Sequence, residues 1–303
     1  MALIYPIILF FTYIMQSIYK DDITRLEQNI LNTSMVQYVS DELDLPPQEI
    51  NQILQMYLGE VNVGLELLRK LDLRGKRVLE VGSGLGLLTH ILNLNNINVV
   101  GIEPGSGGFS TVAKLGKLLR EKLGIPDDLI KDKLAQDLTI ETDGEFDVLF
   151  SVNVLEHIPD ILGAFSGMTR VMRSDGIMRH ICPNYTVPYE PHFGIPLIPF
   201  KPRMTYIFKS SLKQDQLWKS LNFITTGDVQ YISKALGLKT TFDGGLLVET
   251  LERLDNEISF SRRHSSVINT LNKLLRYTRI RSMLKYTPAH ISTPMRFTCQ
   301  FRD

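Results

Sequence analysis

The chain has 303 residues, of which 44% are hydrophobic and 22% are charged, and its formal net charge is zero. These values describe an ordinary folded protein that can bury a full core and is longer than one minimal α/β domain. With only two cysteines, a disulfide framework and a thiolate metal site are excluded, and a reducing compartment is favoured.

Residues 1–19 form an apolar segment without charge. The segment has neither the basic start nor the cleavage site of a signal peptide, and its length is at the lower limit for crossing a bilayer. Three interpretations remain open: a membrane anchor, a helix packed on the domain, and a wrongly assigned start codon. Lys20 and Arg25 follow the segment, which favours a cytoplasmic location for the rest of the chain.

Residues 20–72 are expected to form an N-terminal helical region. Pro46 and Pro47 predict the start of a new helix with Glu49 in its first turn. Apolar residues from Ile50 onward then fall on one face of that helix.

A buried strand is predicted at residues 77–81, and it ends in a turn with three glycines, Gly82, Gly84 and Gly86. An apolar helical pattern restarts directly afterwards. The glycines therefore lie at a strand-to-helix junction, where open α/β sheets bind nucleotide-like ligands. The spacing is Glu-x-Gly-x-Gly-x-Gly. A dinucleotide fingerprint needs a glycine three positions after Gly84, where Leu87 stands, and this argues against a Rossmann oxidoreductase.

Three further strands are predicted along the core. The second, residues 98–103, ends in Glu103, which lies 21 residues beyond Gly82. That separation suits a carboxylate that reaches both hydroxyls of a ribose bound over the glycine turn, and a plain helix cap is the alternative. Residues 131–137 predict a weak third strand and residues 146–153 a strong fourth strand.

A fifth strand is predicted at residues 176–182, after a tight turn at residues 174–176. It contains Arg179 and His180 where an apolar residue is expected in a buried strand. Arg179 fits this position only if its side chain points outward at a sheet margin.

Six prolines between residues 183 and 202 predict a stiff loop without regular structure. The loop leaves the carboxyl end of a central strand, where open α/β sheets place their substrates. Residues 186–226 are therefore interpreted as a substrate lid rather than a passive linker. The residues proposed to contact the acceptor are Tyr185, Tyr189, Glu190 and His192.

The last part of the chain, residues 227–303, is expected to complete the sheet and to carry inserted basic helices. The expected elements are a helix at 225–237, a strand at 238–242, helices at 246–254 and 267–283, and an alternating last strand at 295–302.

The charge is distributed unevenly along the chain. Residues 1–160 carry 13 Lys/Arg and 23 Asp/Glu, whereas residues 161–303 carry 20 and 10. The second half should therefore face the more anionic partner, unless it is only a soluble basic surface. Residues 259–290 contain seven Lys/Arg and no acid, with leucines at helical spacing. This pattern is typical of a stretch that lies on anionic membrane or binds phosphates, or of a solvated helix packed by its leucines.

The glycine loop, Glu103, Asp137 and the segment Phe-Asp-Val-Leu-Phe-Ser-Val-Asn-Val-Leu-Glu-His-Ile-Pro-Asp at residues 146–160 resemble the motifs of the class I S-adenosylmethionine (SAM) dependent methyltransferases. The resemblance is to the branch with small-molecule and quinone O-methyltransferases, and it covers residues 73–185. It implies an α/β fold with a Rossmann-like, doubly wound sheet of about seven strands, the last antiparallel, with added N-terminal and C-terminal helices.

The resemblance also implies SAM as the cofactor. The positions that match the family's cofactor-binding residues are Glu80, Gly82, Ser83, Gly84, Gly86, Glu103, Pro104, Gln136, Asp137, Asn153 and Val154. The residue that meets the adenine amino group would be Asp137, with Gln136 as the alternative.

These features predict methyl transfer from SAM to a small-molecule or lipid-linked acceptor, with a hydroxyl oxygen as the expected methyl acceptor. A hydroxyl acceptor calls for a general base. His192 on the lid is the preferred candidate, and His157 is interpreted as a structural residue that ties the loop to the helix. The six histidines are scattered and lack carboxylates at ligand spacing, so no metal site is predicted.

Two alternatives concern the partner and the activity. A SAM-binding protein without catalysis, associated with a membrane, is the alternative function. The apolar N-terminus and the basic stretch both favour an anionic membrane surface as a partner. Nucleic acid is disfavoured because no known reader motif appears.

Overall fold

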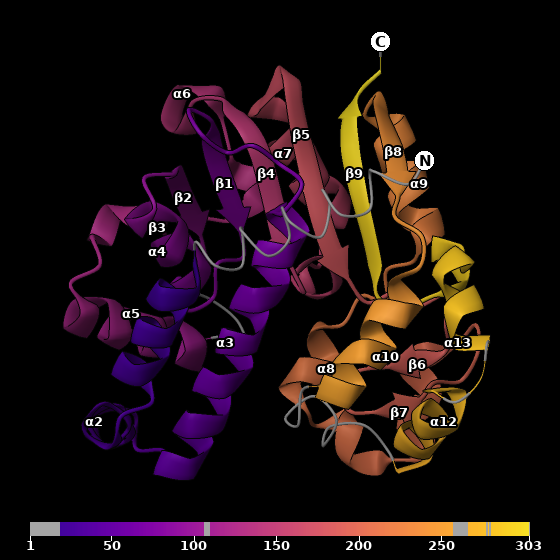
Figure 1. The fold of residues 1–303 in the computed structure, drawn as a ribbon. Helices are drawn as coiled ribbons and strands as arrows, with labels where there is room; N and C mark the ends of the chain where they lie inside the picture. The colour runs from indigo at the N-terminus through magenta and orange to yellow at the C-terminus, as the bar shows by residue number, and fades with distance from the viewer. Residues whose placement is uncertain (1–18, 106–109, 257–265, 277, 279, 303) are drawn as a thin grey trace, which may run out of the picture. The chain divides into compact units, whose positions relative to one another are not determined.

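The computed structural model describes residues 19–105, 110–256, 266–276, 278 and 280–302 (Figure 1). The predictions for residues 1–18, and for the part of the basic stretch at residues 259–265, lie outside the described residues. The contacts divide the chain into two units. The first comprises residues 1–152 and 170–176, and the second comprises residues 153–169 and 177–303.

Seven strands form one mixed sheet in the order β3-β2-β1-β4-β5-β9-β8. Their bounds are β1 (Arg77–Val81), β2 (Asn98–Ile102), β3 (Ile130–Lys131), β4 (Phe146–Val152), β5 (Met172–Cys182), β8 (Leu238–Phe242) and β9 (Met295–Phe301). Strand β1 pairs in parallel with β2 and β4, whereas β9 is antiparallel to both β5 and β8. This is the Rossmann-like α/β sheet that the sequence predicts, with the last strand antiparallel.

In the first unit, helices α2 (Thr33–Leu43) and α3 (Pro47–Leu68) precede the sheet. Helix α3 begins where the two prolines predict it, with Pro46 as the N-cap residue and Pro47 in the first turn. It packs on α4 (Leu87–Leu94), the helix that follows the glycine turn. This unit also contains α5 (Ser110–Leu123) and the short α6 (Ile140–Asp143), and residues 19–30 are helical as well.

The third strand is shorter than predicted. Strand β3 ends at Lys131, and a 3₁₀ helix, η3 (Ala135–Asp137), takes the place of the predicted end of the strand. The segment has too few apolar residues to continue a strand, and Lys131 and Lys133 instead form ion pairs with Asp143, at 3.6 and 2.6 Å. The prediction of a strand across residues 131–137 is therefore wrong beyond its first residue.

Strand β5 is longer than predicted, so the residues assigned to a tight turn, 174–176, belong to the strand. Helix α7 (Ile161–Arg170) precedes it. In the second unit, α9 (Thr226–Ala235) begins with a reciprocal capping box between Thr225 and Asp228 and leads into β8, as the sequence predicts.

Arg179 does not point outward at a sheet margin. It is buried, and its guanidinium donates to Thr298 Oγ1 at 2.7 Å and to Asp243 Oδ2 at 2.8 Å. Arg296 on β9 donates to the same Asp243 oxygen at 2.6 Å and also binds Glu249 on α10 (Leu246–Asn256). The cation is tolerated inside the sheet because it belongs to a four-residue network of two cations and two carboxylates.

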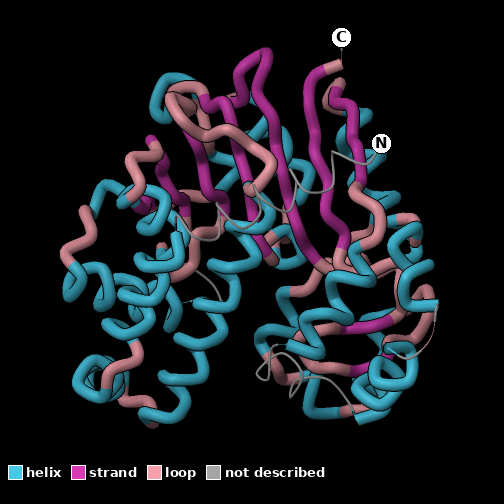
Figure 2. Tube along the Cα trace, viewed as in Figure 1, coloured by secondary structure: helices cyan, strands magenta, loops and turns pink. Residues whose placement is uncertain are grey.

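The proline-rich segment has regular structure, contrary to the prediction. Strands β6 (Tyr189–Glu190) and β7 (Ile195–Pro196) pair in a small antiparallel sheet, drawn in magenta apart from the main sheet in Figure 2. The 3₁₀ helices η5 (Pro202–Ile207) and η6 (Ser210–Lys213) and helix α8 (Gln216–Ser220) follow. Prolines are compatible with this sheet because edge strands tolerate a missing donor.

The predicted helix at residues 267–283 is interrupted. Helix α12 (Ser266–Arg276) ends at Arg276, Thr278 lies in a bend, and α13 (Ile280–Met283) follows. Among the helices in the described ranges, none combines the length and apolar character needed to cross a bilayer.

Candidate active site

The glycine turn after β1 has the backbone conformation that its sequence requires. Gly82, Gly84 and Gly86 all have positive φ, at 72°, 54° and 78°. The backbone nitrogens of Gly82 and Ser83 donate to the carbonyl oxygen of Ile102 at 2.8 and 3.0 Å. The turn is therefore fixed to the end of β2.

Glu80, the acid that opens the glycine motif, is buried at the end of β1. The Thr89 hydroxyl on α4 donates a hydrogen bond to its Oε2 atom. Burial raises the pKa of Glu80 to about 8, because a carboxylate without water is disfavoured. Without cofactor, Glu80 is therefore largely protonated at neutral pH.

Glu103 lies directly after β2 and faces the glycine turn. Its Oε2 atom accepts a hydrogen bond from the Gly84 backbone nitrogen at 2.8 Å. Burial raises the pKa of Glu103, and the bond from Gly84 opposes that effect. Glu103 lines a cavity together with Gly84, Gly105 and Asp132. Pro104 directly follows Glu103 in the chain.

A second cavity also borders this turn. It is lined by Glu80, Gly82 and Ser83, and by Tyr57 and Glu60 from α3. The Ser83 hydroxyl is buried there and makes no hydrogen bond to the described residues. A bound cofactor could therefore form a hydrogen bond with the hydroxyl of Ser83, which is one of the predicted cofactor-binding residues.

Tyr57 and Glu60 were not among the predicted site residues. The sequence pattern assigns Tyr57 only to the apolar face of α3. A Cβ placed on Gly84 would lie 2.4 Å from Tyr57 Cε1, so this ring occupies the space that the glycine leaves open. The sequence signal that could have indicated these two residues is an aromatic residue followed by an acid three positions later. This spacing places both side chains on one side of a helix.

The predicted adenine-binding residues, Gln136 and Asp137, lie on η3 rather than at the end of a strand. The residue that directly follows β3 is Asp132, and its Oδ1 accepts a hydrogen bond from Gly105 N at 3.1 Å. Asp132 is thus the acid beside Glu103, and it was missed because the strand was placed too late. Asn153 and Val154 belong to the second unit, where Asn153 has a positive φ of 52° and donates from its backbone nitrogen to Ile181 O.

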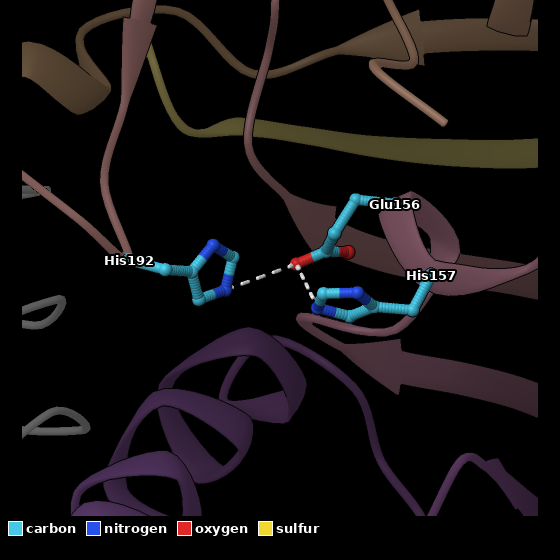
Figure 3. A group of neighbouring side chains, drawn as sticks. All are labelled: Glu156, His157 and His192. Atoms are coloured by element: carbon cyan, nitrogen blue, oxygen red, sulfur yellow. Dashed lines mark ion pairs between the residues drawn. The ribbon is translucent and has the colours of Figure 1, made fainter. Parts of the chain in front are cut away.

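Three chemically active side chains meet in the second unit (Figure 3). Glu156 and His157 lie on the 3₁₀ helix η4 (Leu155–His157), and His192 lies in the turn between β6 and β7. The Oε1 atom of Glu156 lies 3.8 Å from Nε2 of His157 and 3.9 Å from Nε2 of His192. The two rings are tilted by 59° with their centres 5.3 Å apart.

The opposite nitrogen of each histidine has a partner of its own. Nδ1 of His192 lies 2.6 Å from Glu190 Oε1, and Nδ1 of His157 lies 2.8 Å from Ser220 Oγ. Glu190 is completely buried, and it also accepts hydrogen bonds from the Tyr185 hydroxyl at 3.1 Å and from Phe193 N at 2.7 Å. The structure thus joins Tyr185, Glu190 and His192, three of the four residues predicted to contact the acceptor.

The two histidines differ in protonation and access. Burial, with His192 nearby, lowers the pKa of His157 to about 3, so His157 is neutral at physiological pH. The His157 side chain is 11% exposed, against 24% for His192. His157 therefore resembles a structural residue, and His192 is the more accessible of the two.

The atoms of Glu156, His157 and His192 that could ligate a metal lie within 4.8 Å of one another. The sequence argument against a metal assumed that no carboxylate approaches the histidines, and that assumption is wrong. The separations of 3.8 and 3.9 Å between Glu156 Oε1 and the two Nε2 atoms nevertheless exceed the roughly 3.3 Å between ligands at tetrahedral zinc with bonds of about 2.0–2.1 Å. The side chains would have to move together to close around an ion.

A family model described as a methyltransferase domain matches residues 59–234. An uncharacterized protein of Mycobacterium tuberculosis is 30% identical over 229 residues, which cover 73% of this chain and 77% of that protein. The ubiquinone biosynthesis O-methyltransferase of Marinobacter nauticus is 32% identical over 136 residues, or 44% of this chain and 51% of the enzyme. A solved SAM-dependent methyltransferase from Mesorhizobium loti has a TM-score of 0.48 at 12% identity, and the match covers 77% of this chain and 95% of that one.

The family match spans more than half of the 303 residues and includes the glycine turn with its flanking acids. The chain belongs to the class I SAM-dependent methyltransferases. Its cofactor is S-adenosylmethionine, and its reaction transfers the methyl group of that cofactor.

Proposed function

We propose that the chain methylates a hydroxyl oxygen of a small-molecule or lipid-linked acceptor, with His192 as the general base. The observation that carries this proposal is the pairing of His192 Nδ1 with the buried Glu190 carboxylate at 2.6 Å. A carboxylate on Nδ1 favours the tautomer with the proton on that nitrogen, which makes Nε2 the basic nitrogen of the ring.

In the proposed step, Nε2 of His192 takes the proton of the acceptor hydroxyl. The oxygen attacks the methyl carbon of SAM, the bond from that carbon to sulfur breaks, and S-adenosylhomocysteine leaves with the electron pair. The imidazolium that forms is stabilised by Glu190 on one side and by Glu156 on the other. A positioned base of this kind typically contributes about 10²–10⁴-fold in rate.

His157 is assigned a positioning role. A group whose pKa is near 3 is a poor proton acceptor, and its Nδ1 is bound to Ser220. Asn222 holds the same turn, because its Nδ2 donates to the carbonyl oxygens of Leu155 and Ile158 at 2.7 and 2.9 Å.

We assign residues 186–226 as the acceptor-binding segment, with Tyr185 at its entrance. Tyr189 is partly exposed on β6, and burial followed by the nearby Glu190 raises its pKa to about 12. Its hydroxyl therefore stays protonated at neutral pH. Residues 73–185 are assigned to the cofactor core, and residues 227–303 to the end of the sheet with the basic helices.

We further propose that no metal ion takes part, because the ligand atoms stand too far apart and Nε2 of His192 is needed as a base. Turnover should survive a chelator. Loss of turnover with a chelator, restored by added Zn²⁺ or Mn²⁺, would reassign Glu156, His157 and His192 as a metal centre.

The decisive experiment uses SAM labelled in its methyl group. The full chain is incubated with labelled SAM and with separate aqueous and lipid extracts of the source cells. Alkali-stable label in an ether product is expected from an O-methyltransferase, and the labelled extract identifies the acceptor class. The alternative, a SAM-binding protein without catalysis, would bind SAM in calorimetry and transfer label to neither extract.

The location of the chain remains part of the proposal. We assign it to the cytoplasmic side of the cell, with residues 1–19 and the basic stretch at 259–290 directed to an anionic membrane surface. In fractionation, deletion of residues 1–19 should move the chain toward the soluble fraction. An unchanged distribution would remove these residues from the proposal.

A further inference from the structure

An exposed surface that is both apolar and basic covers residues 200–213, which follow β7 in the second unit. Phe200 is fully exposed, and Phe208 and Ile207 are 80% and 57% exposed. Side chains of this kind rarely remain in water without a function when several lie together. We call this set the 200–213 surface; its other apolar members are Met204 and Tyr206.

The exposure is not a sign of missing structure beneath the surface. The 3₁₀ helices η5 and η6 pack against each other, and a small core of Tyr185, Leu197, Leu212, Trp218, Leu221 and Phe223 lies under them. Thr205 is buried and accepts a hydrogen bond from Ile198 N at 3.0 Å. The segment therefore buries some of its apolar side chains in this small core, whereas Phe200 and Phe208 remain exposed to solvent.

The charge of the surface has one sign. Lys201, Arg203, Lys209 and Lys213 are all exposed, and residues 191–214 contain no Asp or Glu. Among the residues that the structure describes, no carboxylate forms an ion pair with these four cations. Arg203 Nη2 donates to the Leu221 carbonyl oxygen at 3.0 Å, and its guanidinium carbon lies 5.6 Å from the centre of the Phe223 ring. Lys213 Nζ lies 6.0 Å from the centre of the Tyr206 ring, and Lys209 Nζ lies 5.9 Å from that of Phe193.

We propose that the 200–213 surface docks on an anionic lipid bilayer, with Phe200 and Phe208 entering the headgroup region and the four cations facing lipid phosphates. Aromatic side chains flanked by lysine and arginine match the amphipathic boundary of a membrane, where rings and cationic heads are both satisfied. This proposal rests on the acceptor-binding role of residues 186–226, and it explains how that segment reaches an amphiphilic acceptor.

A protein partner is the competing occupant. It would need a concentration of carboxylates around an apolar pocket, whereas an anionic bilayer supplies both features over any area. The lipid interpretation also predicts a dependence on salt and on the fraction of anionic lipid that a specific protein pocket does not.

The test places a reporter inside the surface without changing its apolar or charged residues. Both native cysteines are buried, so Ser210→Cys provides a single accessible thiol for a polarity-sensitive fluorophore. Ser174→Cys, exposed on β5, is the matched control. The labelled full chains are titrated with vesicles of phosphatidylcholine alone and of phosphatidylcholine mixed with phosphatidylglycerol.

We expect a blue shift at position 210 with the anionic vesicles only, and none at position 174. Lys209→Gln with Lys213→Gln should weaken the titration about 25-fold, from about fivefold per cation. The pair Lys234→Gln with Lys239→Gln, exposed elsewhere in the same unit, should leave it unchanged.

Absence of any response at position 210 overturns the proposal, even where sedimentation shows the chain on the vesicles, because residues 1–19 or the basic stretch would then be the contact. A response equal on neutral and anionic vesicles also overturns the assigned role of the cations. The measurement uses neither SAM nor an acceptor. Failure of docking is therefore distinguishable from failure of the proposed methyl transfer.

Discussion

At the scale of single residues, Glu103 provides the most direct test of the cofactor site. Its carboxylate faces the glycine turn through Gly84 N. Glu103→Ala should weaken SAM binding by about 1–3 kcal/mol, the usual loss for a hydrogen bond to a charged group. Calorimetry measures the change, with Glu121→Ala on the exposed side of α5 as the control. Wild-type affinity in the Glu103 variant would contradict the assignment, as would tighter binding of NAD than of SAM by the native chain.

The raised pKa of Glu80 predicts that a proton is released when the cofactor binds. The pKa of Glu80 is about 8 without cofactor, so the carboxyl is mostly protonated at pH 7. The positive sulfonium and ammonium groups of SAM favour the ionised form and lower that pKa. Affinity for SAM should therefore rise with pH up to about 8. Titrations at pH 7 in two buffers with different ionisation enthalpies should reveal the proton, and Glu80→Gln should remove the difference between buffers.

Substitution of His192 should affect turnover, whereas substitution of His157 should affect stability. His192→Ala is expected to lower kcat by about 10²–10⁴-fold with SAM affinity unchanged. His157→Ala should instead lower the free energy of unfolding, because it removes a buried ring and the bond to Ser220. Labelled-methyl turnover and urea denaturation are measured for both variants. Unchanged turnover in the His192 variant would exclude it as the base.

At the scale of elements, two glycines on α3 form a matched pair. A Cβ on Gly64 would lie 2.2 Å from Leu88 Cδ2 on α4 and 3.3 Å from Val152 Cγ2, whereas a Cβ on Gly59 meets nothing within 4 Å. Gly64→Ala should therefore destabilise the fold by roughly 1–3 kcal/mol through overpacking. Gly59→Ala should stabilise it by about 0.5–1 kcal/mol, because alanine loses less conformational freedom in a helix. Denaturation midpoints that move in the same direction would contradict the close packing of α3 on α4.

The elements also show which features the sequence could predict. Strong patterns were sufficient to predict β1, β4, β9 and α9 close to their observed bounds. The short β3 was placed too late and the β6–β7 hairpin was missed, because two-residue strands carry no periodicity. Pairing in such strands depends on tertiary contacts rather than on propensity.

The same distinction between local patterns and tertiary contacts applies to the candidate site. The glycine turn and Glu103 could be predicted because their chemistry is local and their spacing is fixed. The pairing of His192 with Glu190 was not predicted, although both residues were named. Neither was the approach of His157, because it requires a turn after β4 and a turn after β6 to fold together. The sequence also did not predict the network of Arg179, Asp243, Arg296 and Glu249, because its members come from four separate parts of the chain.

At the scale of the whole molecule, two buried histidines predict the response to acid. Burial lowers the pKa of His180 and of His157 to about 3 each, from about 6.5 in the unfolded chain. The unfolded state therefore binds more protons between these values, so stability falls as pH drops from about 6.5 toward 3. The slope is about 1.4 kcal/mol per pH unit for each histidine.

Denaturation at pH 7.5 and at pH 5 measures this slope. His180→Leu should reduce the slope of stability against pH by the contribution of one histidine, because the variant has no titratable group between Phe165 and Phe297. His290→Ala, exposed near the end of the chain, is the control and should leave the slope unchanged. An equal slope in all three proteins would show that other groups govern the acid response.

The small core under the proline-rich segment also has an evolutionary consequence. Residues 183–226 carry Tyr185, Glu190 and His192 on a fold with its own apolar centre, whereas Glu80, the glycine turn and Glu103 are encoded upstream of residue 105. Under the acceptor-binding role proposed for residues 186–226, mutations that adapt the chain to a new acceptor can accumulate in one contiguous stretch of the gene, while the donor chemistry is inherited intact. Descendants of such a chain would diverge in substrate before they diverge in reaction.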